Sequence, residues 1–275
     1  MIREGLSFKD YTALPGLNQS KLGALRACPQ KFKWALSCQR KDSDSMRLGR
    51  AIHTAVFEPE LFNQEFLCLP EIDRRTAKGK AEYAEIIAAN PTKTILKPED
   101  FNKALEIATE VRGNPHVMKL IDGAHVELSL DWEDAATGVL CKGRIDCYNE
   151  ELGIIVDLKT TLDASPKGFP RKLYSYGYHR QAAWYLEGLR AHNEPAAHFV
   201  FIAVETAPPY SLGLYRLADN TIRLSKAENE ALLRRYAECL RTDTWPGYTN
   251  GIEDISIPEY GENVLEENHG TEESL

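Results

Sequence analysis

Three short runs in the middle of the chain alternate apolar and polar side chains, and each run predicts a β-strand. The first covers 125–132, the second ends at Cys147, and the third begins with the apolar stretch 154–156. Turn-forming residues separate them, at 134–138 and at 149–153. Two consecutive hairpins are therefore expected, which together make an antiparallel three-stranded unit.

Apolar residues at helical spacing surround this unit. They predict helices from Ser20, as N-cap, to about Cys28, then over 46–57, 74–90, 98–112, 178–191 and 221–240, with irregular chain at 59–70. Further strands are expected at 198–205 and 211–217. The order predicts an α/β (α+β) fold, in which helices flank a mixed central β-sheet. We expect a single domain over 1–258, with a mainly helical part at 1–115 and a sheet core at 116–258.

The predicted hairpins bring charged side chains together. A turn centred on Glu151 and Leu152 places Asp146 opposite Asp157, and the preceding turn places Glu127 opposite Asp146. Asp157 and Lys159 share one strand face, because they are two residues apart. Carboxylates that face one another destabilise a sheet unless a cation joins them. Oxygen ligands of this kind suit Mg²⁺ or Mn²⁺ better than zinc.

Simpler explanations compete with each of these assignments. Acidic residues near hairpins are usually solvated, and an Asp-x-Lys triplet occurs often by chance. His53 lies on a predicted helix, where a single histidine is more often structural than a ligand. Gln181 and Tyr185 are four residues apart on another helix and could simply form its half-exposed face.

Charge is unevenly distributed along the 275 residues. The net charge is −8, but residues 259–275 contain six Glu and no Lys or Arg, and this tail is expected to be disordered. Basic residues gather instead within 21–50, among them Lys31, Lys33, Arg47 and Arg50. The negative net charge of the whole chain therefore does not exclude DNA binding.

Other patterns exclude whole classes of protein. No apolar run approaches the roughly 20 residues of a membrane span, and no phosphate-binding glycine loop is present. The six cysteines include no C-x-x-C pair, which argues against a zinc ribbon, a disulfide framework and a cysteine-ligated iron–sulfur cluster. A cytoplasmic location is expected.

With these residues placed, the chain resembles the PD-(D/E)xK nuclease superfamily, and within it the RecE-type (exodeoxyribonuclease VIII-like) and RecB-like phage exonucleases. The resemblance covers roughly residues 18–250. It rests on an ordered series of motifs, namely Ser20…Cys28-Pro29…Trp34, Gly49…His53, Glu127, Gly143-Arg144-Ile145-Asp146, Asp157-Leu158-Lys159-Thr160, Gln181…Tyr185 and Trp245-Pro246-Gly247-Tyr248. Ile145 stands where the superfamily name has Pro, and Asp157 replaces Glu.

The resemblance implies an αβββαβ core and a role for each matching residue. Asp146, Asp157 and the Leu158 carbonyl would bind metal, with Glu127 as a further acidic ligand and His53 as a conditional one. Lys159 would be the catalytic lysine. Gln181 and Tyr185 would position the DNA strand, and Lys31, Lys33, Arg47 and Arg50 would grip its backbone.

The implied function is Mg²⁺- or Mn²⁺-dependent 5′→3′ digestion of linear double-stranded DNA ends, without an iron–sulfur cluster. The 3′ strand left behind would pass to a RecT-like single-strand annealing recombinase, and a ring-shaped homo-oligomer is implied as well. One alternative is a single-strand nuclease like AddB or the CRISPR-associated nucleases. The other is a non-catalytic DNA-binding or recombinase-docking module that keeps only the fold.

Overall fold

A computed structural model describes residues 1–38, 43–73 and 75–259. The acidic tail expected to be disordered lies outside the described residues from position 260 onward.

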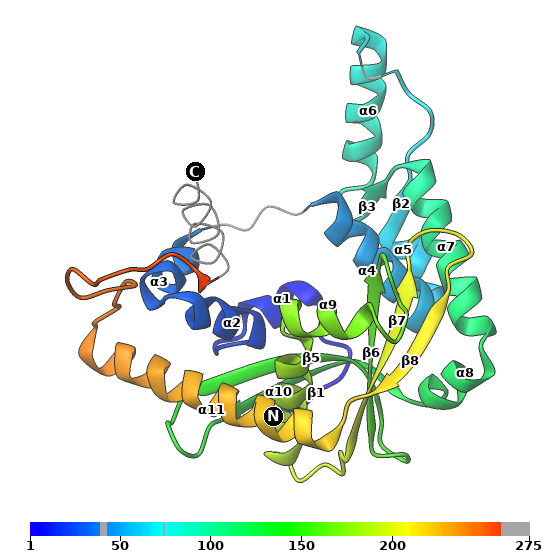
Figure 1. The fold of residues 1–275 in the computed structure, drawn as a ribbon. Coiled ribbons are helices and arrows are strands. Elements are labelled where there is room, and N and C mark those ends of the chain that lie inside the picture. Colours follow the sequence, from blue (N-terminus) through cyan, green and yellow to red (C-terminus); the bar gives the residue numbers. More distant parts are fainter. Residues whose placement is uncertain (39–42, 74, 260–275) are drawn as a thin grey trace, which may run out of the picture.

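The described residues contain one large sheet, which forms the centre of the molecule (Figure 1). β6 and β7 pair in parallel and the other neighbours are antiparallel, so the sheet is mixed, as predicted. In spatial order its strands are β1 (Ile2–Arg3), β4 (His125–Glu133), β5 (Leu140–Asn149), β6 (Ile154–Thr161), β7 (His198–Glu205) and β8 (Leu212–Arg216).

The register of the central strands is the one that the turns predict. Cys147 pairs with Val156 across β5 and β6, and Leu128 pairs with Ile145 across β4 and β5. Both pairings confirm hairpins folded about the expected turn centres. A one-residue slip would have moved every side chain of a strand to the other sheet face.

Helices cover both faces of this sheet (Figure 1). On one face Ile155 and Phe201 enter a core with α2, α3, α10 and α11, and on the other Val156 and Ile202 enter a core with α4, α5, α7 and α8. Neighbouring residues of a strand thus serve opposite cores, which is the two-residue period of β-structure. The helices are α1 (Phe8–Ala13), α2 (Gln19–Ala27), α3 (Pro29–Ser37), α4 (Asp44–Phe57), α5 (Pro59–Glu65), α6 (Ala77–Ala89), α7 (Pro98–Gly113), α8 (Pro115–Ile121), α9 (Phe169–Tyr176), α10 (Tyr178–Arg190) and α11 (Asp219–Thr242).

Two local predictions are wrong, and three short elements were not predicted. The stretch 59–70 is not irregular, because it forms α5 and then β2 (Phe66–Cys68), which pairs in parallel with β3 (Thr94–Leu96). The N-cap of α2 is Asn18 rather than Ser20, because the Asn18 side chain accepts the Lys21 amide hydrogen. The sequence pattern also missed β1, α1 and α8, since each is too short to show a period.

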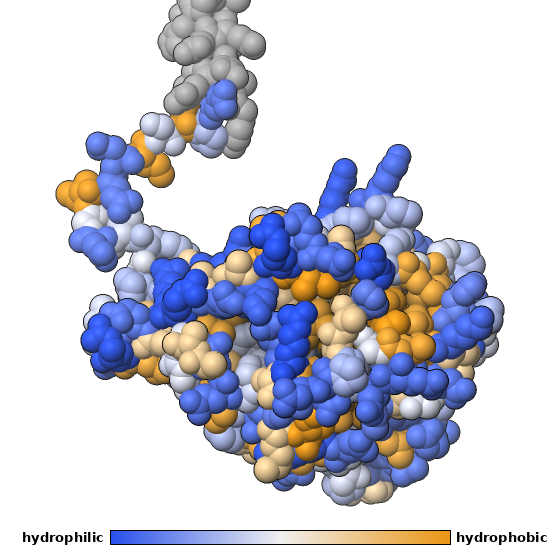
Figure 2. Space-filling view, turned by 90° about the horizontal axis from the view of Figure 1, so that it is seen from below, coloured by the Kyte–Doolittle hydropathy of each residue, from blue (hydrophilic) through white to orange (hydrophobic). Residues whose placement is uncertain are grey.

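The molecular surface carries separate apolar patches among hydrophilic residues, as Figure 2 shows for the face seen from below. Such a mixture is ordinary for a folded protein. None of the described helices is both long enough and apolar enough to cross a membrane.

Candidate active site

The ladder between β4 and β5 is interrupted at the row that contains Glu127 and Asp146. Pairs form on both sides of that row, at Val126–Cys147 and Leu128–Ile145, but none is made within it. Glu127 has a φ of 53°, a left-handed conformation that is uncommon for a residue other than glycine. Backbone strain of this kind is often found where a side chain is held for function. Glu127 and Asp146 thus lie together at an interruption of the regular ladder.

His53 reaches this row from α4. Its Nδ1 lies 3.2 Å from Oδ2 of Asp146, and the same oxygen accepts a hydrogen bond of 3.3 Å from the Leu158 amide. His53, Glu127 and Asp146 each offer one ligand atom, and these atoms all lie within 4.8 Å of one another. The structure therefore brings His53 to Asp146, which is more than 90 positions away in the chain.

Asp157 and Lys159 form a buried ion pair beside this group. The Lys159 Nζ lies 2.5 Å from Oδ1 of Asp157, whose side chain is fully buried. Neither Asp157 oxygen accepts a hydrogen bond of good geometry from the described residues. The Lys159 ammonium also lies 4.8 Å from the ring centre of Tyr178. We call His53, Glu127, Asp146, Asp157 and Lys159 the carboxylate site.

Burial and like charge shift the pKa values of Asp146 and Asp157 upward. Burial, reinforced by Glu127, raises the pKa of Asp146 to about 7, although Lys159 opposes the shift. Burial also raises the pKa of Asp157 to about 6, again against the effect of Lys159. The carboxylates thus carry more negative charge than their surroundings stabilise, and a proton or a cation would relieve it.

The two basic members of the carboxylate site respond in opposite directions. Burial and the nearby Lys159 lower the pKa of His53, so its imidazole is neutral and able to bind metal at neutral pH. Burial alone would lower the pKa of Lys159, but Asp157 and Asp146 outweigh it and raise the pKa. Lys159 therefore carries a fixed positive charge next to the acidic groups.

These residues fit a divalent cation. Carboxylate oxygens and one neutral imidazole form a donor set that can hold such an ion, and the carboxylate of Asp157, paired with Lys159, is buried beside it. Asp157 lies outside the group formed by His53, Glu127 and Asp146. Its role as a ligand, and that of the Leu158 carbonyl, remain predictions.

Gln181 and Tyr185 lie one helical turn apart on α10, which packs on the sheet face opposite to α4. The Gln181 amide donates a hydrogen bond of 3.1 Å to the Tyr185 hydroxyl. Gly143 allows the Tyr185 ring to approach β5, because a Cβ there would lie 3.1 Å from two ring carbons. Burial, with Tyr11, Asp146 and Asp157 as further causes, raises the pKa of Tyr185 well above its usual value. The hydroxyl is therefore kept protonated.

Arg144 is a site residue to which the sequence analysis gave no role. Its guanidinium contacts the Glu127 carboxylate and donates a hydrogen bond of 2.6 Å to the Leu6 carbonyl. It also lies about 6 Å from the ring centres of Phe8 and Tyr11. Arg144 thus holds Glu127 and ties the N-terminal segment to the site. The signal was its place beside Asp146, but a contact with residues 6–11 cannot be read from local spacing.

Lys142 fixes the same N-terminal segment from two residues earlier on β5. Its buried ammonium donates hydrogen bonds to the carbonyls of Tyr11, Thr12 and Leu14 at the end of α1. A cation at the carbonyl end of a helix is favourable. Burial lowers its pKa, with a further contribution from Lys21.

The four basic residues expected to grip DNA fall into two groups. Arg47 and Arg50 belong to α4, the helix that carries His53. Lys31 and Lys33 belong to α3 and contact the C-terminal turn, with Lys31 over the Tyr248 ring and Lys33 paired to Asp243 at 2.6 Å. Phe32 stacks on Trp245 in the same region, so this turn packs against the body as expected.

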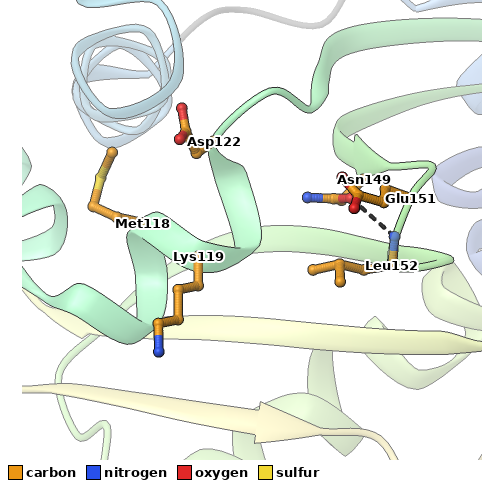
Figure 3. Close-up of a pocket in the computed structure, with 6 residues that line it drawn as sticks. All are labelled: Met118, Lys119, Asp122, Asn149, Glu151 and Leu152. Carbon is orange, nitrogen blue, oxygen red and sulfur yellow. Dashed lines mark hydrogen bonds between the residues drawn. The ribbon is translucent and has the colours of Figure 1, made fainter.

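One surface hollow lies apart from this chemistry. It encloses about 310 Å³ between α8 and the β5–β6 turn, and Met118, Lys119, Asp122, Asn149, Glu151 and Leu152 line it (Figure 3). The Asn149 side chain accepts the Leu152 amide hydrogen there, which is a turn contact. No member of the carboxylate site lines this hollow.

Residues 18–257 match the family described as PDDEXK-like domain of unknown function (DUF3799). The chain belongs to this family. The predicted membership of the PD-(D/E)xK superfamily is thereby confirmed, as is the fold class. No curated protein matches the chain.

Solved structures include similar folds. A proposed exonuclease from Eubacterium rectale aligns with a TM-score of 0.62 at 17% identity, over 93% of this chain and 97% of that one. A phage-related exonuclease from Haemophilus somnus 129PT aligns with a TM-score of 0.34 at 14% identity, over 85% and 98% of the two chains. The alignment with the Eubacterium rectale protein shows that it and this chain share a fold.

Proposed function

We propose that this protein is a metal-dependent exonuclease that hydrolyses phosphodiester bonds of linear double-stranded DNA in the 5′→3′ direction. The observation that carries the proposal is the buried Asp157–Lys159 pair beside the His53, Glu127 and Asp146 group. Burying these charges costs free energy that a purely structural site would avoid. Family membership and the shared fold support the nuclease class.

His53, Glu127, Asp146 and Asp157 would hold Mg²⁺ or Mn²⁺. When bound, such an ion activates water and stabilises charge on a phosphate. Lys159 is held by Asp157 in one position and would place its ammonium toward the reacting phosphate, where negative charge increases during hydrolysis. The protonated Tyr185 hydroxyl, oriented by Gln181, would donate to a phosphate oxygen of the same strand. Arg47 and Arg50 would contact the DNA backbone without reading its sequence.

The biological setting is proposed on the resemblance alone. The 3′ strand left by the enzyme would pass to a RecT-like single-strand annealing recombinase in phage-type recombination. The protein would act in the cytoplasm as a homo-oligomer that forms a ring around DNA.

The decisive experiment is digestion of linear duplex DNA labelled at either its 5′ or its 3′ ends, in Mg²⁺, Mn²⁺ or EDTA. We expect early metal-dependent release of the 5′ label, no cleavage of a covalently closed circle, and no release by the Lys159→Ala variant. Early release of the 3′ label would instead indicate digestion in the 3′→5′ direction. Faster digestion of the same DNA after it is denatured to single strands, compared with the duplex, would favour the AddB-like alternative. A protein that binds DNA but hydrolyses none of these substrates would favour the alternative of a non-catalytic docking module.

A further inference from the structure

The segment 165–176, which leads from the catalytic strand β6 into α9, is basic and aromatic. It contains Lys167, Arg171 and Lys172 and no acidic residue. The side chains of Tyr174 and Tyr176 are exposed, at 68% and 66%. Neither the sequence motifs nor the proposed chemistry assigns a role to these tyrosines. A basic, aromatic surface complements the phosphates and bases of a nucleic-acid strand.

Both exposed rings are held in place by a second ring beneath them. Tyr174 stacks on His179 with 5.5 Å between ring centres and 14° between planes. Tyr176 stacks on Tyr178 at 5.6 Å and 29°. Because the rings are already ordered, less side-chain entropy would be lost when another flat group stacks on them.

The backbone between the helices makes this stacking possible. Gly177, at the end of α9, has a φ of 71°, and a Cβ there would lie 2.3 Å from the Arg180 guanidinium. Glycine adopts this left-handed conformation without strain, and the turn sets Tyr176 and Tyr178 against each other on either side of it. The arrangement of the two rings is therefore built into the fold.

The inner ring connects this surface to the carboxylate site. The Lys159 ammonium lies 4.8 Å from the centre of the Tyr178 ring, and Tyr176 stacks on that same ring. Tyr178 therefore links Tyr176 to the catalytic lysine. Lys172 contacts both the strand that carries Lys159 and the Tyr176 ring. It donates a hydrogen bond of 2.7 Å to the carbonyl of Thr160, next to Lys159, and lies 5.4 Å from the Tyr176 ring centre.

We propose that Tyr174 and Tyr176 form a stacking platform for unpaired bases of the DNA strand that is cut, with Lys172 contacting the adjoining phosphate. The inference rests on the proposed nuclease function and adds how the enzyme receives its strand. Aromatic side chains recognise base faces, and those faces are covered inside a duplex. The platform therefore selects a frayed or single-stranded end rather than the interior of a duplex.

The test measures binding of a single-stranded oligonucleotide that carries a fluorescent adenine analogue at its 5′ end. EDTA is present, so that no hydrolysis is needed. Stacking of the analogue on tyrosine quenches its emission. We expect Tyr174→Leu and Tyr176→Leu each to weaken binding roughly tenfold, the order of one lost base–aromatic stack, and to reduce the quenching. Tyr174→Phe and Tyr176→Phe keep the ring and should match the parent.

Tyr83→Leu is the matched control, since Tyr83 lies on α6, which projects away from the sheet in Figure 1. Unchanged affinity and quenching in both leucine variants, or failure of the parent to bind the oligonucleotide, would overturn the platform. Stacking without hydrolysis of labelled duplex would support the platform and reject the nuclease. Hydrolysis of labelled duplex, together with unchanged oligonucleotide binding in both leucine variants, would support the nuclease and reject the platform.

Discussion

The Lys159 ammonium lies 2.5 Å from the carboxylate of Asp157, and the Asp157 side chain has no exposure to solvent. Each charge is stabilised mainly by the other, because both are removed from water. The pair is therefore expected to behave as a unit when either member is replaced.

Lys159→Met should lower the free energy of unfolding by about 3–5 kcal/mol at pH 8 in EDTA, because it leaves a buried carboxylate without its cation. The double variant Asp157→Asn/Lys159→Met should recover most of this loss. Urea denaturation of the parent, both single variants and the double variant measures the coupling. Additive losses across the four proteins would show that the two side chains do not depend on each other.

The stability of the metal-free protein should fall as pH rises. The pKa values of Asp157 and Asp146, about 6 and about 7 in the folded protein, exceed the ordinary aspartate value of 3.8. The folded state therefore binds more protons than the unfolded state from about pH 4 to about pH 7, and raising pH favours unfolding across that window. Unfolding temperatures in EDTA measure the effect. Asp157→Asn should show a weaker dependence; an identical pH profile in that variant would contradict the assignment.

Divalent cations should stabilise the protein most at alkaline pH. Mn²⁺ or Mg²⁺ must displace the proton that Asp146 holds below its pKa of about 7, so binding weakens as pH falls through that value. Calorimetric titration at pH 8 and at pH 6 measures the difference. Asp146→Asn should weaken binding at least tenfold, whereas Glu151→Gln, an exposed carboxylate on the β5–β6 turn, should not. Equal losses in the two variants would indicate nonspecific ion binding.

Gly143→Ala should reduce nuclease activity more than it reduces stability. The added Cβ would lie 3.1 Å from two carbons of Tyr185 and displace the ring. A displacement on the order of 1 Å can cost about a hundredfold in rate. A Cβ at 3.1 Å requires the ring to move by a few tenths of an ångström, so kcat should fall by roughly threefold. Gly113→Ala is the control, since no atom lies within 4 Å of a Cβ there. Parental kcat in a well-folded Gly143→Ala protein would remove Tyr185 from the proposed chemistry.

Much of the central sheet could be predicted because its signals are local. The alternation of β4 to β6 and the two intervening turns predict strands, hairpins and the register that pairs Cys147 with Val156. The same pattern brings Asp146 near Asp157 and puts Lys159 on the face of Asp157. Short elements such as β1 and α8 escaped prediction, because two to seven residues do not establish a period.

The amino-acid sequence by itself determined strands β4 to β6, their register and the acidic and basic residues that the hairpins bring together. Only the tertiary structure decided that His53 approaches Asp146 from α4, that Arg144 holds Glu127, and that Tyr178 lies under Lys159. It also decided the break at Glu127, where the ladder loses a pair and the backbone adopts a positive φ. These features depend on helices distant in the sequence packing against opposite sheet faces, and the periodicity within a single element does not encode that packing.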